Sequence, residues 1–351
     1  MPSMPRSHLR ELRFWDKSSI YMKVTVLDGH GLNPGDVSWE PIKALASDFT
    51  VYDRSPQELV AERIGDSEII LLNKVRITSE IIEKCPRLRY VGVLATGYNV
   101  VDTKACRERG ITVTNIPSYS TNAVAQHVFA FILHFTNQVA SHSASVHEGK
   151  WISNPDFCYW LSPLTEISGK TLGIFGFGHI GQKVAEIALS FGMKVIVHAH
   201  SEESFKKGLD CLSLPSSKLS EISSVSLEDL FRESDFLSLH APLTPETTEL
   251  VNENTLSLMK PSAILINTAR GGMISEKDVR AALDSKKIAA YAADVLLEEP
   301  MSKNCPLYKA PNCLITPHLA WAPKETRLRL LDIAIGNIKA FMAGKPVNVV
   351  N

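Results

Sequence analysis

The chain has 351 residues, of which 44% are hydrophobic and 21% charged, and its formal net charge at pH 7 is -1. This length predicts two domains, and the balanced charge, without a block of like charges, gives no support for nucleic acid or an anionic membrane as a partner. The 6 cysteines are scattered without a CxxC pair, which is typical of reduced thiols and predicts a cytoplasmic protein. No apolar run approaches the roughly 18 residues of a membrane span.

The first 21 residues are polar, carry three arginines and lack the apolar core of a signal peptide. Met22 is followed at once by a strand-like apolar run. We therefore expect residues 1–21 to be an N-terminal extension, with Met22 as the natural start. A weak organelle-targeting peptide is the alternative, which Glu11 and Asp16 disfavour.

From Met22 onward, short β-branched runs alternate with helical patterns such as Pro56–Ile64 and Ser79–Lys84. This alternation predicts βαβ units and a parallel sheet. Ligands of such sheets bind beyond the carboxyl ends of the strands, which marks Asn73–Val75 and Ala95–Asn99 as candidate binding segments. The predicted strands are Val24–Leu27, Phe49–Tyr52, Ile69–Leu72, Tyr90–Leu94 and Ile111–Thr114.

A long helix is predicted from Ser120 to about Val146, apolar on most sides and hence buried at a domain or subunit junction. The segment Trp151–Leu164 then breaks the helical periodicity and is rich in aromatic residues. It is interpreted as a lid or a subunit contact, with an ordinary packed surface loop as the alternative.

A second sheet begins at Leu172, and its six predicted strands fit a doubly wound dinucleotide-binding domain. An amphipathic stretch from Pro323 to Met342 follows, which makes the first domain discontinuous if it packs back on the first sheet. We predict one domain at 22–119 and 319–351 and another at 120–318. The predicted strands are Leu172–Phe177, Lys194–Ala199, Asp235–His240, Ala263–Thr268, Ala289–Asp294 and Cys313–Thr316.

The first strand of this second sheet ends in Gly176-x-Gly178-x-x-Gly181, and a helical pattern that closes at Gly192 follows at once. In a dinucleotide fingerprint the first glycine permits the tight turn, the second lets the backbone approach a pyrophosphate, and the third lets helix and strand pack closely. The helix N-terminus offers N–H groups and partial positive charge to the phosphates. The plain alternative is a glycine-rich turn that binds nothing.

Three stretches that follow predicted strands of this sheet carry reactive side chains, and parallel strands deliver their ends to one edge. Ketone reduction needs a cation for the substrate carboxylate, a proton donor, and a carboxylate that orients the donor and favours its charged form. Arg270, His318 and Glu299 fit these roles, with Glu298 as the competitor for the last. Taken singly, each also fits a salt-bridged arginine, a packed histidine or a common loop glutamate.

His198 and His200 alternate at the end of one strand, but no third ligand with suitable spacing is evident, so no metal site is predicted. Four other histidines lie on or just after the long helix and are expected to be structural or exposed, namely His127, His134, His142 and His147.

These motifs together resemble the D-isomer-specific 2-hydroxyacid dehydrogenases over essentially all of Met22–Asn351, and among them the bacterial glycerate dehydrogenases, or hydroxypyruvate reductases. The closer match rests on the segments Leu27–Gly29, Leu94–Asn99, Pro155–Cys158 and His318–Trp321. The resemblance implies an α/β fold in which a Rossmann dinucleotide-binding domain is inserted in a flavodoxin-like substrate domain. It also implies a homodimer with its interface built largely on the dinucleotide-binding domains.

The resemblance further implies that Arg270, Glu299 and His318 are the catalytic residues, and that Asn73 and the amides around Thr96 and Gly97 bind substrate together with Arg270 and His318. His179 and Ile180 would contact the pyrophosphate. The remaining implied coenzyme contacts are Gly176, Gly178, Gly181, His200, Ser201, His240, Ala241, Pro242, Thr268, Ala269, Arg270, Asp294 and His318.

One position departs from an NAD-selective site, which usually has an acidic residue about 20 residues after the glycines. Ala199 stands there, although Glu202 and Glu203 follow closely, as do Lys206 and Lys207. We expect NAD or NADP as the cofactor, with the 2′-phosphate tolerated.

The function expected on these grounds is NAD(P)H-dependent reduction of a small 2-keto acid, hydroxypyruvate or glyoxylate, to D-glycerate or glycolate. A D-2-hydroxyacid dehydrogenase of broad specificity for bulkier 2-keto acids is one alternative. A dinucleotide-sensing binding protein, like the corepressors that share this fold, is the other.

Overall fold

The computed structural model describes residues 22–351, so the predicted N-terminal extension lies outside the described residues. The chain divides into two compact units, of which the first ends at Tyr119 and resumes at Lys324, and the second runs from Ser120 to Pro323. The return to the first unit lies five residues after the predicted boundary, at 324 rather than 319. Backbone amides of Leu319 and Ala320 are hydrogen-bonded to Asp294 of the second unit, which keeps that loop there.

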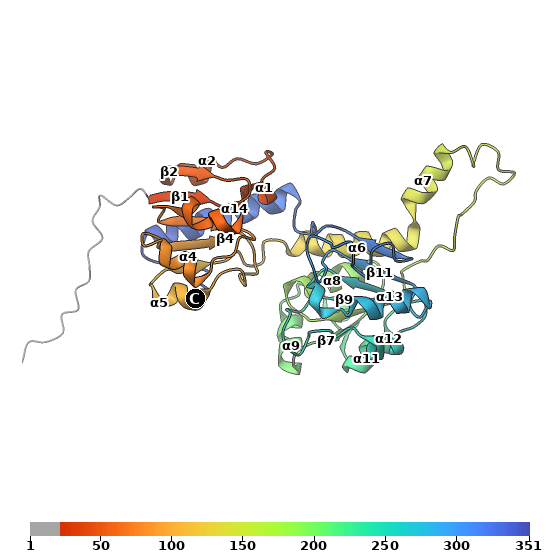
Figure 1. Ribbon diagram of the computed structural model, residues 1–351. Coiled ribbons are helices and arrows are strands. Elements are labelled where there is room, and N and C mark those ends of the chain that lie inside the picture. Colours follow the sequence, from red (N-terminus) through yellow and green to blue (C-terminus); the bar gives the residue numbers. More distant parts are fainter. Residues whose placement is uncertain (1–21) are drawn as a thin grey trace, which may run out of the picture. The chain divides into compact units, whose positions relative to one another are not determined.

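The first unit contains a five-stranded parallel sheet in the order β2-β1-β3-β4-β5 (Figure 1). This is the 2-1-3-4-5 order of flavodoxin-like folds, as predicted. The strands coincide with the β-branched runs to within a few residues. They are β1 Met22–Val26, β2 Ala46–Val51, β3 Ile69–Leu72, β4 Tyr90–Val93 and β5 Thr112–Thr114.

The last helix, α14 (Lys324–Met342), belongs to this first unit and explains why it is discontinuous in sequence. Arg327 on α14 donates two hydrogen bonds to the Asp36 carboxylate, at 2.6 and 2.7 Å. Farther along the helix, the Phe341 ring lies 4.8 Å from that of Tyr90 on β4. The other helices of the unit are α1 Gly29–Leu32, α2 Glu40–Lys43, the 3-10 turn η1 Gln57–Leu59, α3 Val60–Ile64, α4 Ser79–Lys84 and α5 Thr103–Glu108.

The second unit contains a parallel sheet of seven strands in the order β12-β11-β10-β9-β6-β7-β8. Counted from β6 this is 3-2-1-4-5-6-7, the Rossmann order with one strand added, and the order reverses between β6 and β9. The predicted count of six was wrong, because β8 was missed: it is a three-residue strand with two exposed serines and carries little apolar signal. The strands are β6 Thr171–Phe175, β7 Lys194–His198, β8 Ile222–Ser224, β9 Phe236–Leu239, β10 Ile264–Asn267, β11 Ala290–Ala293 and β12 Cys313–Ile315.

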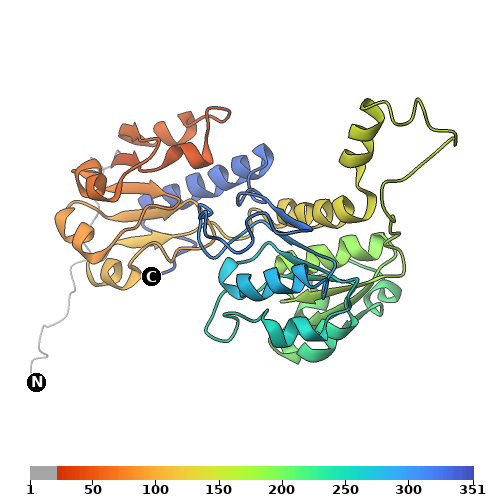
Figure 2. The same cartoon turned by 45° about the vertical axis from the view of Figure 1, so that its right-hand side comes forward.

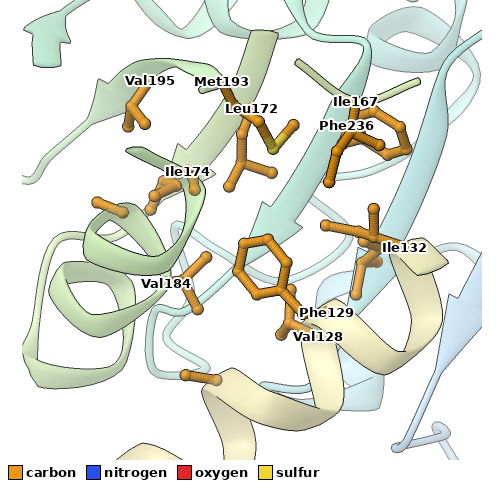
Figure 3. Packing of buried hydrophobic residues seen from close by; sticks show 14 of the residues in the cluster. Val128, Phe129, Ile132, Ile167, Leu172, Ile174, Val184, Met193, Val195 and Phe236 are labelled. Atoms are coloured by element: carbon orange, nitrogen blue, oxygen red, sulfur yellow. The ribbon is translucent and has the colours of Figure 1, made fainter. Parts of the chain in front are cut away.

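Helices α6 (Thr121–Asn137) and α8 (His179–Ser190) cover one face of this sheet. Figure 3 shows Val128, Phe129 and Ile132 of α6 pointing at the apolar side chains of β6. A second apolar cluster forms with helices of the opposite face. The remaining helices are α7 Val139–His147, α9 Glu202–Asp210, α10 Ser216–Leu219, α11 Leu227–Glu233, α12 Glu253–Leu258, the 3-10 turn η2 Gly271–Met273 and α13 Glu276–Asp284.

The prediction of one long buried helix from Ser120 to Val146 was wrong beyond Asn137. Gln138 adopts a left-handed conformation with φ of 48°, which ends α6 and starts α7 in a new direction. Of the residues of α7, only Ser145 is buried. We call α7 and the loop up to Glu166 the arm, and Figures 1 and 2 show it extending away from the sheet of its own unit.

Candidate active site

The glycine fingerprint forms the turn between β6 and α8, next to the point where the strand order reverses. Gly176 has φ of 92°, and a Cβ there would lie 2.9 Å from the backbone of His240 and Ala241. A Cβ on Gly181 would lie 2.3 Å from the Gly176 carbonyl oxygen. Both positions therefore require glycine for close packing.

The N-terminus of α8 is open toward a ligand. Its N-cap residue is Gly178, which offers no side chain to the first amides of the helix, those of His179, Ile180 and Gly181. A Cβ on Gly178 would meet no atom of the described chain within 4 Å. A backbone with this shape, whose first helical amides have no capping side chain from Gly178, suits a pyrophosphate.

The loop after β10 presents Arg270 and is shaped by a buried asparagine. The Asn267 side chain accepts a hydrogen bond from the Ala269 amide at 3.0 Å and donates one to the Arg270 carbonyl at 2.9 Å. The Arg270 side chain is exposed, and its Nη1 donates to the Ala269 carbonyl at 2.6 Å. Thr268 Oγ1, by contrast, is buried without a partner in the described chain, so a bound group with a polar atom here would satisfy it.

The loop after β11 begins with Asp294, which is only 2% exposed and holds the loop after β12. Its Oδ1 accepts hydrogen bonds from Thr316 Oγ1 at 2.6 Å and the Leu319 amide at 2.8 Å, and its Oδ2 accepts one from the Ala320 amide at 2.9 Å. The donors lie on either side of His318. Asp294 thus fixes the backbone that carries this histidine.

His318 is bonded to Glu299. Its Nδ1 lies 2.7 Å from Glu299 Oε2, and the other carboxylate oxygen, Oε1, accepts a hydrogen bond from the Leu296 amide at 3.0 Å. A carboxylate can only accept a hydrogen bond, so Nδ1 carries a proton. Nε2 is then the ring nitrogen that can exchange a proton with a ligand. The structure thus places Glu299 beside His318, and not the competitor Glu298.

The loops after β10 and β11 pack directly on each other. A Cβ on Gly271 would lie 1.9 Å from the Leu296 backbone, so only glycine allows Arg270 this close to the loop of Glu299. Glu276, the first residue of α13, adds a brace by accepting a hydrogen bond from the Leu297 amide at 2.9 Å. Arg270, Glu299 and His318 are therefore held by three loops that contact one another.

His240, at the end of β9, lies beside the glycine turn. Burial lowers the pKa of His240 to about 3, so the ring is neutral, and its Nε2 lies 2.8 Å from Ser238 Oγ. The Gly176 packing described above brings Ala241 against the fingerprint, with Pro242 next in sequence. This segment can line a dinucleotide site through its shape and backbone.

The end of β7 is where a coenzyme ribose is discriminated in such sheets. Ala199 is half-buried and His200 exposed, while the Ser201 hydroxyl is engaged as the N-cap of α9, accepting from the Ser204 amide at 3.1 Å. Across the turn lies Glu246, whose pKa is lowered chiefly by its hydrogen bond with Thr244, with His200 contributing. Sequence reasoning did not single out this carboxylate.

Lys206 and Lys207, considered as cations for a 2′-phosphate, lie on α9. Lys206 is 3.6 Å from Glu202 on the same exposed helix face. The Glu202 carboxylate therefore partly offsets the positive charge that Lys206 could offer to a 2′-phosphate.

The predicted substrate residues Asn73, Thr96 and Gly97 follow β3 and β4 of the first unit. Asp28, just after β1, accepts hydrogen bonds from the amides of Asn73 at 2.7 Å and Lys74 at 2.6 Å. Thr96 Oγ1 donates to the Ile116 carbonyl at 2.8 Å, which ties the second segment to the end of β5. Asp28 lies in the segment at Leu27 that carries the family resemblance, but its contacts with these amides were not predicted.

His198, considered above with His200 as a possible metal ligand, packs inside its own unit. Its ring stacks on Phe175 at 5.6 Å, and its Nδ1 lies 3.1 Å from the Val225 carbonyl oxygen.

Within residues 22–351 no cluster of three or more His, Cys, Asp or Glu side chains could hold a metal ion. Nor does any helix of that range have the length and apolarity to span a membrane.

Residues 129–320 match the NAD-binding domain of the D-isomer specific 2-hydroxyacid dehydrogenases. A hydroxypyruvate reductase of Blautia hydrogenotrophica is 46% identical over 94% of this chain and 100% of its own length. The chain belongs to this family. It is an oxidoreductase that uses a nicotinamide dinucleotide and acts on small 2-keto or 2-hydroxy acids, as the motifs predicted.

Two further relatives are similar over most of the chain, one by sequence and one by solved structure. A glycerate dehydrogenase of Methylorubrum extorquens is 38% identical over 84% of this chain and 89% of its own. The solved structure of an acyclic imino acid reductase in complex with NADPH and D-Arg is 33% identical, with a TM-score of 0.78, and covers 94% of this chain and 100% of its own. The glycine cradle, the open α8 N-terminus and the unpartnered Thr268 hydroxyl agree with a dinucleotide as the shared ligand.

Proposed function

We propose that this dehydrogenase reduces hydroxypyruvate and glyoxylate to D-glycerate and glycolate. The observation that carries the proposal is the 2.7 Å bond between His318 and Glu299, on a loop in contact with that of Arg270. Support for the substrate comes from the relatives, since those at 46% and 38% identity are a hydroxypyruvate reductase and a glycerate dehydrogenase.

The proposed roles follow from the chemistry of each group. Reduced nicotinamide, when bound, supplies the hydride that the carbonyl carbon accepts. Arg270 pairs with the substrate carboxylate and polarises the carbonyl, because its guanidinium offers a rigid fork of donors. His318 donates a proton from Nε2 to the forming alkoxide, while Glu299 holds the ring and balances its positive charge. Asn73, Thr96 and Gly97 remain predicted substrate contacts.

For the coenzyme we propose that both NADH and NADPH are used. Ala199 leaves no carboxylate to bond the ribose diol or to repel a 2′-phosphate, and His200 and Ser201 lie beside it. Glu246 and Glu202 oppose this acceptance, since each adds negative charge near the turn. The imino acid reductase at 33% identity, solved with NADPH, supports use of the phosphorylated coenzyme within this fold.

The experiment is a panel of 2-keto acids assayed with NADH and NADPH, followed by absorbance at the nicotinamide band. We expect kcat/KM to be highest for hydroxypyruvate, then glyoxylate, and lower for bulkier keto acids. Ammonia supplied with the 2-keto acid that corresponds to arginine forms an acyclic imine, and this arm tests the imino acid reductase activity of the relative at 33% identity. A higher kcat/KM for a bulky keto acid, or for the imine, would overturn the substrate assignment.

Arg270→Lys tests the carboxylate clamp on the same panel. Lysine keeps the charge but loses the bidentate fork, so KM for hydroxypyruvate should rise and kcat/KM should fall by roughly tenfold or more. The KM for a coenzyme measured at saturating keto acid serves as the internal control. Unchanged kinetics would remove Arg270 from this role.

We further propose a homodimer that buries the arm. Ile152 and Phe157 are 90% and 89% exposed, and Trp151 and Trp160 are also exposed. A monomer seldom exposes so many large apolar side chains together, whereas a second copy of this chain would cover them. Light scattering should give a dimer mass for the wild type and a monomer for the double variant Ile152→Ser/Phe157→Ser, and a monomeric wild type would refute the proposal.

We place the protein in the cytoplasm. All six cysteines are free thiols, two of them exposed, which suits a reducing compartment. Fractionation of the source cells with an antibody against the native protein tests this, and recovery outside the cytoplasmic fraction would contradict it.

A further inference from the structure

His127, on the buried helix α6, contacts the loop of His318 although it lies far from it in sequence. Its Nε2 lies 3.0 Å from Thr316 Oγ1 and 3.8 Å from Asp294 Oδ1. The side chain is 16% exposed, and its ring meets that of Phe131 edge-on at 4.4 Å. The histidine is therefore held both by packing and by a polar contact.

The direction of each hydrogen bond in this group follows from the donors available. The Asp294 carboxylate accepts from Thr316 Oγ1 at 2.6 Å, so the single hydroxyl proton of Thr316 points at Asp294. The Thr316 oxygen must then accept in its contact with His127, which makes the ring Nε2–H the donor. The series of hydrogen bonds thus runs from His127 through Thr316 to Asp294. The same Asp294 carboxylate also accepts hydrogen bonds from the amides of Leu319 and Ala320.

The ring suits the role of a neutral donor. Burial lowers the pKa of His127 below its ordinary value, and the nearby Asp294 carboxylate opposes this only in part. A neutral imidazole carries one N–H, and the contact with Thr316 places it on Nε2.

We infer that His127 is a positioning residue for the proton donor: by orienting the Thr316 hydroxyl onto Asp294, it fixes the loop that aims His318. The loop needs such support because His318 itself has φ of 52°, a left-handed conformation that non-glycine residues seldom adopt. This inference rests on the proposed role of His318 and adds a residue outside the loops that carry the reaction.

The test compares three substitutions of His127 in the full-length enzyme. Gln can place an amide N–H where Nε2 stands, whereas Leu has no donor and Asn is too short to reach Thr316. We expect His127→Leu and His127→Asn to lower kcat for hydroxypyruvate roughly tenfold, the scale of one lost hydrogen bond, and His127→Gln to recover most of it. The Kd for NADH, measured by fluorescence, should change less than twofold.

His134→Leu is the matched control, since it makes the same substitution two turns along α6, where the ring packs beside Phe135. It should leave kcat within twofold of wild type. Thermal melting accompanies each variant, and the Asn and Gln pair decides the matter if the Leu variant does not fold.

A double-mutant cycle separates this role from general packing. If His127 acts through Thr316, then His127→Leu combined with Thr316→Val should be no slower than Thr316→Val alone. Additive losses, or equal rates for His127→Asn and His127→Gln, would overturn the inference. If His318→Ala is itself as active as wild type, the proposed function fails instead, so the two failures are distinguishable.

Discussion

Two histidines end parallel strands at the same edge of one sheet, yet their surroundings differ. His240 follows β9, is half-buried, and meets the neutral hydroxyl of Ser238 at 2.8 Å. His318 follows β12, keeps 28% of its side chain exposed, and meets the Glu299 carboxylate at 2.7 Å. Desolvation lowers the pKa of His240 to about 3 and its partner is neutral, so its ring is uncharged, whereas the carboxylate beside His318 fixes the orientation of that ring.

A histidine that follows a parallel strand is therefore only a candidate for catalysis. The group that its ring bonds to, a neutral hydroxyl for His240 and a carboxylate for His318, distinguishes the two candidates. His200, at the end of β7, is a third case, exposed and beside a turn that discriminates coenzymes. Substitutions at these three places should therefore separate chemistry, coenzyme choice and stability.

The largest effect is expected for His318→Ala. Removal of a proton donor lowers turnover by roughly a hundredfold or more, because general acid catalysis contributes on that scale. Steady-state kcat for hydroxypyruvate measures it, with NADH Kd as the control. A variant that retains most of its kcat would remove His318 from the reaction.

Glu299→Gln would give His318 a neutral partner, as His240 has. We expect kcat to fall roughly tenfold, since the charge that balances the imidazolium is lost and a bond to a charged group is weakened. Glu298→Gln is the matched control one residue away and should change kcat less than twofold. Equal effects at the two positions would show that the 2.7 Å contact does not support catalysis.

Ala199→Asp should alter the coenzyme preference at the end of β7. The added carboxylate can bond the ribose diol and repels a 2′-phosphate, so the ratio of kcat/KM for NADH over NADPH should rise roughly tenfold. Ala199→Asn keeps the size without the charge and should change the ratio less. A wild type that already rejects NADPH a thousandfold would show that Glu202, Glu203 or Glu246 performs this selection.

His240→Gln should have the smallest effect, visible as stability at acid pH. The pKa of His240 is about 3 in the folded protein, below its ordinary value of about 6.5, so the unfolded chain binds a proton that the folded chain excludes. The free energy of unfolding is therefore not reduced by this group above about pH 6.5, and it falls as pH drops from there toward 3. The melting temperature should therefore drop less between pH 7 and pH 4.5 for the variant than for wild type, and equal drops would contradict a ring that stays neutral in the folded protein.

Much of this arrangement could be predicted from the sequence, because β-branched runs locate strands and parallel strands end at one edge. That reasoning selected Arg270, Glu299 and His318 as catalytic candidates, and the structure places them on loops that contact one another. It missed the break at Gln138, which depends on a left-handed residue rather than on periodicity. It also missed His127 and Asp28, whose partners lie 189 and 45 residues away and become neighbours only in the folded sheets.

The central claim is that His318 donates the proton in a reaction coupled to hydride transfer. The most direct test is a single turnover in which enzyme preloaded with NADH is mixed with hydroxypyruvate and loss of nicotinamide absorbance is followed in milliseconds. Product release, which limits many steady-state rates, does not enter this measurement. We predict that His318→Ala oxidises its bound NADH at least roughly a hundredfold more slowly than wild type at equal occupancy. Equal rates of NADH oxidation would contradict the account.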